Sequence, residues 1–285
     1  MNELIVDTNN ILFNLNEIKN KISNEDYTII AVVKGNGYGL DIIQLTNFLS
    51  QNGIHFFAVA AFEEAIKLRQ AGITEKIMIL TPFTDVEIVK ELINNDIVLT
   101  IDSEESAKIA NEIALVQDKK ITAHIKIDTG LSRFGFNYIE NEKISEVIKK
   151  SNYINFEGIF SHFSNSLARD DFWSREQYSR FCKTIVFLEN AGITFRLKHI
   201  CNSSGFFKYP DMHLNAARIG SAFCGLAARK RFKTKKSWNF SYKNCTHKRT
   251  TKRRFHRIWK FLCSKKKNKN WNSPYTDISM ELEKL

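Results

Sequence analysis

The sequence predicts an α/β protein whose residues 1–225 form a closed (β/α)8 barrel of the TIM type. Three observations favour this class: eight short β-branched runs, helical periodicity between them, and a span of little more than 200 residues. Barrels of this type begin at about 200 residues. The alternative is an open, doubly wound parallel sheet, because periodicity alone does not separate the two.

The strands and helices are predicted in alternation along the chain. Segment 9–22 carries apolar residues three and four apart, which predicts a helix before the first strand. Segments 61–72 and 102–114 show the same spacing, and the second opens with an Asp/Ser cap followed by glutamates. The eight predicted strands lie at 28–34, 55–60, 76–81, 96–101, 121–127, 156–162, 195–200 and 214–220.

Composition indicates a globular protein of the cytoplasm. Hydrophobic residues make up 43% of the chain, yet no apolar run approaches the roughly 18 to 20 residues that span a bilayer. The N-terminus MNELIVDTNN lacks the basic start and apolar centre of a signal peptide. The five cysteines are widely spaced with no CxxC pair, which favours reduced thiols over disulfides or a metal site.

Residues 226–285 differ sharply from the rest of the chain. They hold 19 of the 42 basic residues but only 3 of the 31 acidic ones, and all 12 glycines lie before them. Three of the four tryptophans also fall there. No alternating strand of useful length is predicted in this basic tail, which we therefore separate from the barrel as a second region, out of frame or disordered.

Chemically useful side chains gather where the predicted strands end. In a barrel these ends share one face, and that face carries the active sites of such proteins. The first such residue is a lysine that a β-branched strand delivers into a loop of three glycines, as a covalent nucleophile would require. The residues at the strand ends are Lys34, Asp128, Arg133, His162, Asn202, Ser203 and Arg218.

Four blocks of sequence resemble the alanine racemases, which are pyridoxal 5'-phosphate enzymes with an N-terminal (β/α)8 barrel. The first block, AVVKGNGYGL, is similar to their cofactor-lysine motif. KIDTGLSRFGF, FEGIFSHFSNS and HICNSSGFFKYPDMHLNAARIGSAFCGL follow in the order found in that family. The resemblance runs from about residue 4 to residue 225.

The resemblance implies a role for each matching residue. Lys34 would bind the cofactor covalently and move the proton at the substrate α-carbon. Arg133 would hold the substrate carboxylate, and His162 would pack near the cofactor ring and bond towards Arg218. Arg218 would face the ring nitrogen, and because a guanidinium only donates, it would leave that nitrogen unprotonated. The phosphate would be held by Tyr38, Ser203, Ser221 and the backbone around Gly220, and Asn202 would brace that cofactor-binding loop. Lys126 matches a lysine that can be carbamylated.

The activity implied is interconversion of L-alanine and D-alanine for peptidoglycan precursors, in a homodimer. In that family a second, β-rich domain supplies a tyrosine to the neighbouring site as the second base, and no match to it follows Gly225. We therefore expect crippled racemisation. The alternatives are a non-catalytic pyridoxal phosphate carrier, a serine racemase, and a basic protein that binds nucleic acid, the last being disfavoured. For the tail itself, a frameshift is favoured over a genuine basic segment or an appended disordered one.

Overall fold

The computed structural model describes residues 2–226 and 233–242. The chain divides into two units, one of residues 4–240 and one of residues 1–3 with 241–285, and most of the second lies outside the described residues. The fold that follows is that of the first unit. Among the residues described, no helix combines the length and apolarity needed to cross a membrane.

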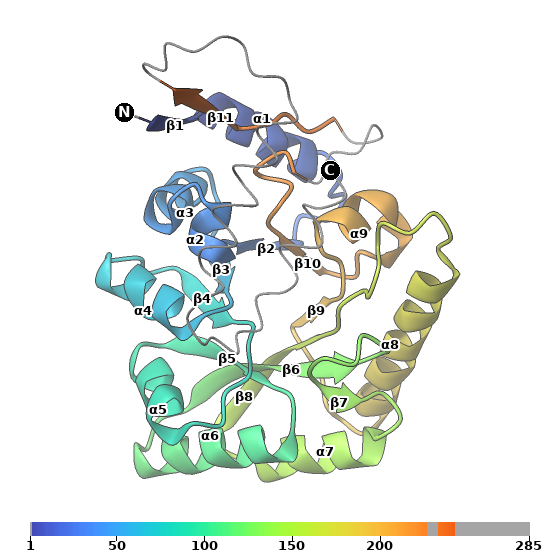
Figure 1. Ribbon diagram of the computed structural model, residues 1–285. Coiled ribbons are helices and arrows are strands. Elements are labelled where there is room, and N and C mark those ends of the chain that lie inside the picture. The colour runs from blue at the N-terminus through green and yellow to red at the C-terminus, as the bar shows by residue number, and fades with distance from the viewer. Residues whose placement is uncertain (1, 227–232, 243–285) are drawn as a thin grey trace, which may run out of the picture. The chain divides into compact units, whose positions relative to one another are not determined.

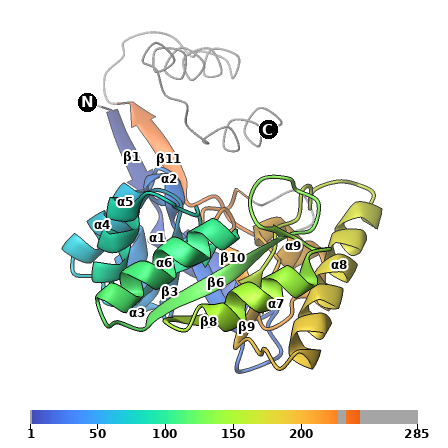
Figure 2. The ribbon, with the colours of Figure 1, turned by 90° about the horizontal axis from the view of Figure 1, so that it is seen from below.

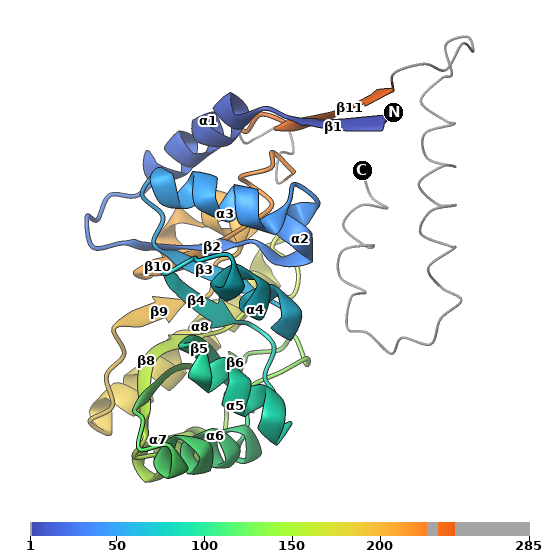
Figure 3. The same cartoon turned by 90° about the vertical axis from the view of Figure 1, so that its left-hand side faces the viewer.

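Eight parallel strands form the predicted barrel, with helices following one another around the outside (Figure 1, Figure 3). The hydrogen-bonded order is β10-β2-β3-β4-β5-β6-β8-β9, and a short strand β7 (Phe136–Asn137) pairs with β6. The barrel strands are β2 (Thr28–Val32), β3 (Phe56–Val59), β4 (Lys76–Ile79), β5 (Ile97–Ile101), β6 (Ile121–Asp128), β8 (Ile154–Phe160), β9 (Leu197–His199) and β10 (Ala216–Ile219). Each overlaps one predicted run, which confirms the predicted fold class.

The helices connect successive strands and pack on their outer faces. The predicted cap at Ser103 is confirmed, since its hydroxyl accepts the backbone N–H of Ser106 at 3.2 Å. The helices are α1 (Thr8–Lys19), α2 (Lys34–Tyr38), α3 (Ile42–Gln51), α4 (Phe62–Gln70), α5 (Val86–Asn94), α6 (Glu104–Val116), α7 (Asn141–Lys150), α8 (Phe172–Asn190) and α9 (Ser203–Lys208), with a 3-10 turn at Pro210–Met212.

Two hydrophobic clusters separate the inside of the barrel from its outside. Ala31 and Val33 of the first strand region belong to the cluster shared with the helices, whereas Ile30 and Val32 belong to a smaller one. Because side chains alternate along a strand, the smaller cluster marks the barrel interior. Its buried members are Ile30, Val32, Phe56, Ala58, Met78, Val98, Phe160, Leu197 and Ala216.

The barrel closes between β9 and β10, the two ends of the sheet order, through side-chain hydrogen bonds and an isolated backbone hydrogen bond. The Asn215 side chain accepts the Lys198 N–H at 2.7 Å and donates to the Arg196 carbonyl at 2.7 Å. The backbone N–H of Arg218 donates to the Cys201 carbonyl at 3.0 Å. These contacts join β9 to β10 and favour the closed barrel over the open sheet.

Replacing Asn215 with alanine is expected to loosen this seam. Both bonds are lost together, and a lost hydrogen bond that strands a partly buried group costs about 1 to 3 kcal/mol. We expect lower stability in urea unfolding and faster hydrogen exchange at the Lys198 amide. Asn215→Asp keeps the acceptor but not the donor, so its stability should lie between that of the wild type and that of Asn215→Ala. Unchanged protection of the Lys198 amide in the alanine variant would contradict the role.

The described part of the tail contains a strand that the sequence did not predict. β11 (Trp238–Tyr242) pairs with β1 (Asn2–Val6), and the two lie side by side in Figure 2. Just before it, Asn14 of α1 donates to the Lys235 carbonyl at 2.8 Å and accepts the Lys235 N–H at 2.6 Å. The expectation of no strand was wrong here because pairing with a distant segment, rather than local pattern, makes β11. The rest of the predicted tail, 227–232 and 243–285, lies outside the described residues.

Candidate functional site

The predicted site residues lie at the C-terminal ends of the barrel strands. Lys34 follows β2, Arg133 follows β6, His162 follows β8, and Arg218 lies within β10 near its end. Asn202 and Ser203 follow β9, and Gly220 and Ser221 follow β10. Parallel strands in a barrel point the same way, so one end of the barrel collects all of them. The structure thus brings the predicted residues together, while the role of each stays a prediction.

The loop after Lys34 is a left-handed turn. Five successive residues from Gly35 to Gly39 have φ between 53° and 86°, and two of them, Asn36 and Tyr38, are not glycine. A side chain adopts this conformation at a cost, and such strain gathers at functional sites. Glu64 steadies the turn by accepting the Asn36 N–H at 3.0 Å. The glycines let the chain reverse immediately after the lysine.

Tyr38 from this turn lies directly against the end of β10. A Cβ atom added at Gly220 would fall 2.2 Å from the Tyr38 hydroxyl oxygen, so any other residue there would displace the tyrosine ring. Nearby, the Ser203 hydroxyl accepts the N–H groups of Gly220 and Ala222 at 3.0 and 3.3 Å. The Ser203 hydroxyl proton is left to donate elsewhere. Tyr38, Ser203 and Gly220, predicted as phosphate-binding residues, therefore share one corner of the site.

Asn202 acts locally as a cap for the helix that follows it. Its side-chain oxygen accepts the Gly205 N–H at 2.9 Å, and Ser166 donates to the same oxygen at 3.0 Å. Across the site, Asp128 accepts the N–H groups of Gly130, Leu131 and Ser132 at 2.9 to 3.1 Å. This bracing fixes the turn that carries Arg133, whose side chain is exposed at the rim.

Arg218 is the most extensively bonded residue of the site. One terminal nitrogen donates to His199 Nδ1 at 2.5 Å, and the other donates to His162 Nδ1 at 3.0 Å and to the Ser161 carbonyl at 2.7 Å. Its guanidinium carbon lies 5.0 Å from the Phe160 ring centroid. Burial lowers its pKa from 12.5 to about 9, so Arg218 stays a cation at neutral pH. The predicted bond between His162 and Arg218 is present.

The site concentrates positive charge. The pKa of His162 is lowered well below 6.5, first by burial and then by the charges of Arg218, Arg133, Lys126 and Lys34. His162 is therefore a neutral imidazole at neutral pH, and as an acceptor at Nδ1 it carries its proton on Nε2. Arg218, Arg133 and Lys34, together with the partly charged Lys126, surround one neutral ring and favour a ligand with several negative charges.

Lys126 lies inside the barrel with 4% of its surface exposed. Its amine donates to the Ile127 carbonyl at 3.0 Å and lies 5.5 Å from the Phe160 ring centroid. Burial, followed by the charge of Arg218, lowers its pKa from 10.5 to about 7. A large fraction of this amine is therefore uncharged at neutral pH, as carbamylation requires.

The shifted pKa of Lys126 predicts a dependence of stability on pH. Between about pH 7 and 10.5 the folded chain holds a neutral amine and the unfolded chain a charged one, so the unfolded state binds more protons and stability rises with pH. The full rise is about 5 kcal/mol. Lys126→Met has no titrating amine at this position, so the free energy of unfolding of that variant should fall relative to the wild type as pH rises from about 7 to 10.5. Urea unfolding in buffers purged of carbon dioxide measures this, and a pH-independent difference would refute it.

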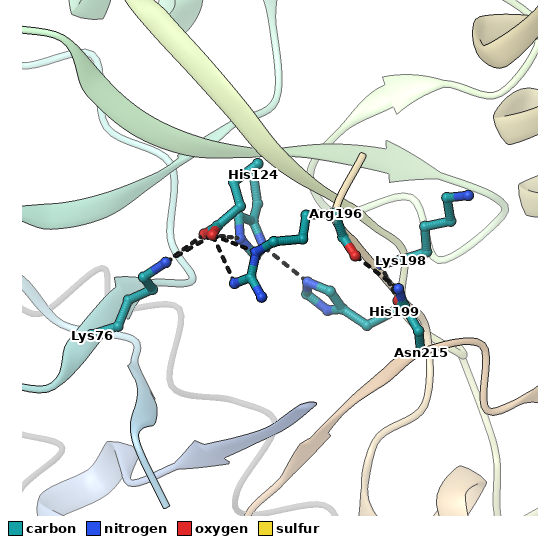
Figure 4. Close-up of polar contacts among 7 residues, drawn as sticks. Lys76, His124, Arg196, Lys198, His199 and Asn215 are labelled. Atoms are coloured by element: carbon teal, nitrogen blue, oxygen red, sulfur yellow. Dashed lines mark hydrogen bonds and ion pairs between the residues drawn. The ribbon is translucent and has the colours of Figure 1, made fainter. Parts of the chain in front are cut away.

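Sequence reasoning missed three residues behind Arg218. His199 of β9 contacts His124 of β6 (Figure 4). His124 in turn faces Glu157 of β8. Their signal was polar residues inside otherwise apolar strands, as in ITAHIKI, FEGIF and RLKHI. A buried polar side chain requires a hydrogen-bond partner, so a polar residue in each of these strands predicts a polar contact inside the barrel.

A cavity of about 700 Å³ lies at the other end of the barrel, where strands begin. It is lined by Lys76 and Arg196 among others and includes none of the predicted site residues. The chemistry predicted from sequence therefore does not belong there.

The sequence matches the family described as alanine racemase, N-terminal domain, over residues 6–228. An alanine racemase of Methanococcus maripaludis is 37% identical over 224 residues, which cover 78% of this chain and 59% of that protein. One of Clostridium perfringens is 38% identical over 218 residues, covering 75% and 55%. The chain thus spans less than three fifths of the length of these curated relatives.

Solved structures of alanine racemases have the same fold. That of Clostridium difficile 630 gives a TM-score of 0.78 at 32% identity, covering 84% of this chain and 64% of that one. That of Bacillus anthracis, with bound L-Ala-P, gives 0.75 at 28% identity, covering 84% and 63%.

Proposed function

The chain belongs to the family of the alanine racemase N-terminal domain, and on that premise we propose that it binds pyridoxal 5'-phosphate at Lys34 and moves the α-proton of alanine. Pyridoxal 5'-phosphate is the cofactor of this family. The observation that carries the proposal is the cluster of Lys34, Lys126, Arg133 and Arg218 around a neutral His162 at the C-terminal end of the barrel.

The residues present fit this cofactor. Its phosphate suits the corner formed by Tyr38, Ser203 and Gly220, where a Cβ at Gly220 would meet the tyrosine hydroxyl. Among the described residues, Arg218 bonds through both terminal nitrogens and its Nε–H has no hydrogen-bond partner. That N–H is available to a ring nitrogen. When bound, the cofactor supplies an electron-withdrawing ring that makes the substrate α-proton acidic.

Each protein residue then has a defined task. Lys34 would take or return the α-proton from one face of the substrate. Arg133 would bind the substrate carboxylate at the rim through a charge-assisted pair. Arg218 donates and cannot accept, so it would hold the ring nitrogen unprotonated and limit how much negative charge the ring draws from the substrate. A neutral His162 would likewise bring no proton or positive charge to the cofactor ring, and so would also limit how much negative charge the ring draws from the substrate.

Lys126 is proposed to carry a carbamate in the active chain. Its amine is largely neutral near pH 7, and the charges that lower its pKa, Arg218 and Arg133, would pair with the carbamate anion. We further expect the family's homodimer and a cytoplasmic location.

Racemisation also needs a proton from the opposite face of the substrate. In the family this proton comes from a tyrosine of the second domain, and the relatives match this chain over only 55 to 59% of their own length. We therefore propose that the 285-residue chain exchanges the α-proton of one enantiomer but inverts it slowly. The loss of one general acid–base group lowers a rate by about 10²- to 10⁴-fold.

The test compares exchange with inversion on the full chain loaded with cofactor. L-Alanine and D-alanine are incubated separately in D2O, α-deuterium is followed by NMR, and inversion is followed by chiral chromatography. Exchange of one enantiomer should exceed inversion by about 10²- to 10⁴-fold. Inversion near the ordinary enzyme median of about 10 s⁻¹ would disprove the crippled state. If the chain binds the cofactor but exchanges neither enantiomer, it is a non-catalytic carrier of pyridoxal 5'-phosphate. If it exchanges the α-proton of serine faster than that of alanine, serine is the substrate.

A further inference from the structure

A chain of polar groups runs through the barrel interior from Arg218 to a carboxylate at the other end. Arg218 donates to His199 Nδ1 at 2.5 Å, and His199 Nε2 lies 2.9 Å from His124 Nδ1. His124 Nε2 then faces Glu157 Oε2 at 3.6 Å, slightly beyond hydrogen-bond distance. Figure 4 shows both imidazoles lying between the strands and pointing towards one another. The two histidines are fully buried.

The donor character of arginine determines where each proton in this chain lies. A guanidinium only donates, so His199 Nδ1 must accept and His199 carries its proton on Nε2. That N–H donates to His124 Nδ1, which places the second proton on His124 Nε2. The last N–H points at an acceptor, the Glu157 carboxylate. One arrangement of protons therefore satisfies the contacts from Arg218 to His124 and leaves the last N–H facing the carboxylate at 3.6 Å, with a cation at one end of the chain and an anion at the other.

Charges around the chain keep both imidazoles neutral. Burial lowers the pKa of His199, and the charge of Arg218 lowers it further. Burial also lowers the pKa of His124, with Glu157 opposing and Lys76 and Arg196 adding to the effect. For Glu157, burial acts to raise the pKa, but the facing His124 ring and the hydrogen bonds from Lys76 and Arg196 outweigh it and hold the pKa well below 4.5. The carboxylate is thus ionised at neutral pH.

The fold is locally adapted to aim Glu157 into the barrel. The pairing of β6 with β8 joins Ala123 to Phe156 and His124 to Gly158, which leaves Glu157 as the extra residue of a bulge. Bulges re-aim side chains and are frequent beside active sites. Phe156 belongs to the outer cluster, so alternation directs Glu157 inwards, and the bulge then lets Gly158 face the same side, against the His124 ring. Lys76 and Arg196 then hold the carboxylate at 2.8 and 2.7 Å.

The two rings have little freedom to rotate. A Cβ at Gly158 would lie 2.6 Å from the His124 ring, and the Phe56 ring lies perpendicular to that ring with the two centroids 5.7 Å apart. The His199 ring stacks on Phe160 with a 9° interplanar angle. Rigid packing lets the position of one ring determine that of the next.

We propose that Glu157, acting through His124 and His199, is a positioning residue that sets the orientation of Arg218 towards the ring nitrogen of the cofactor. The proposal rests on the function proposed above. A carboxylate bonded directly to Arg218 would place a negative charge beside the cofactor ring. Two neutral imidazoles transmit the orientation instead and keep that charge at the far end of the barrel.

The first experiment reads the proton positions in the full chain without cofactor. With ¹⁵N-labelled histidine, we expect NMR to show His124 and His199 neutral, protonated at Nε2 and unprotonated at Nδ1, with no titration between about pH 5 and 8. Protonation of Nδ1 in either ring, or titration of either in that range, would overturn the chain. Glu157→Leu should shift the His199 resonances, although residue 157 does not touch that ring, and Glu157→Gln should shift them less.

The second experiment isolates the ring nitrogen. Dissociation constants are compared for pyridoxal 5'-phosphate and for its analogue with C–H in place of the ring nitrogen. Loss of one positioned hydrogen bond should reduce the preference for the nitrogen compound by about two- to tenfold in Glu157→Leu. Glu157→Gln should restore part of it. Lys76→Met removes an ion pair of the same carboxylate but no member of the chain, so its preference should equal the wild type.

The outcomes separate this proposal from the function itself. Equal weakening of both compounds in Glu157→Leu, or an equal loss in Lys76→Met, would indicate a merely structural role and overturn the proposal. If the wild-type chain binds neither compound, the proposed function fails and the role towards the cofactor fails with it. If the cofactor binds normally while the histidines carry other tautomers, the function stands and the chain of residues is rejected.

Discussion

Lys34→Ala is expected to abolish covalent attachment of pyridoxal 5'-phosphate and to lower α-proton exchange by at least about 10⁴-fold, the upper range for loss of one acid–base group. On the proposed function one amine would serve both tasks, and a left-handed turn follows that lysine directly at the end of β2. Reduction with borohydride followed by peptide mass spectrometry locates the attachment. Exchange is measured in D2O as for the wild type.

Lys34→Arg is the matched control for this variant. It keeps a positive charge at the end of β2 but has no amine to bind the cofactor or to carry the proton. We expect cofactor to bind non-covalently with a smaller loss of affinity than in Lys34→Ala, and exchange to be lost in both. Cofactor that remains covalently attached in Lys34→Ala would show that another lysine is the site.

Gly158→Ala is expected to lower the free energy of unfolding by about 2 to 4 kcal/mol. The new methyl group would lie 2.6 Å from two atoms of the His124 ring, which Phe56 and His199 hold in place. Overpacking of a core costs about 1 to 3 kcal/mol, and weakening of the bond between the two histidines adds about 1 kcal/mol. Denaturant unfolding measures the loss.

Two controls identify the cause. Gly72→Ala, at φ 82° with no atom within 4 Å of the new Cβ, should cost only the backbone term of about 1 kcal/mol. In a His124→Ala background the ring is gone, so Gly158→Ala should cost little beyond the cost of His124→Ala itself. An undiminished cost in that background would show that the crowding is not with the histidine ring.

Much of the fold was predictable because it depends on local pattern. Each of the eight predicted strands overlaps an observed barrel strand, and the cap at Ser103 lies where the sequence placed it. Strand β11 was missed because its sequence, WNFSY, gains its partner from β1 more than 230 residues away. Pairing of that kind depends on tertiary context, which local propensity does not contain.

The candidate site was predictable in part for the same reason. Strand ends recur on one face of a barrel, so the placement of Lys34, His162 and Arg218 follows once the strands are known. The resemblance to the alanine racemases assigned the roles. The three residues behind Arg218 were not predictable in this way, because Glu157, His124 and His199 come from three strands that are distant in sequence.

The sequence by itself determined the strands, their order along the chain, and the family to which residues 6–228 belong. Only the tertiary structure decided the contacts that cross the barrel. A one-residue bulge in β8 places Glu157 and Gly158 on the same, inner side of the strand, and Asn215 joins β10 to β9, the two ends of the sheet order. The physical reason is that periodicity reports which face a side chain takes in a regular strand, whereas register shifts and contacts across the interior are set by how the strands pack together.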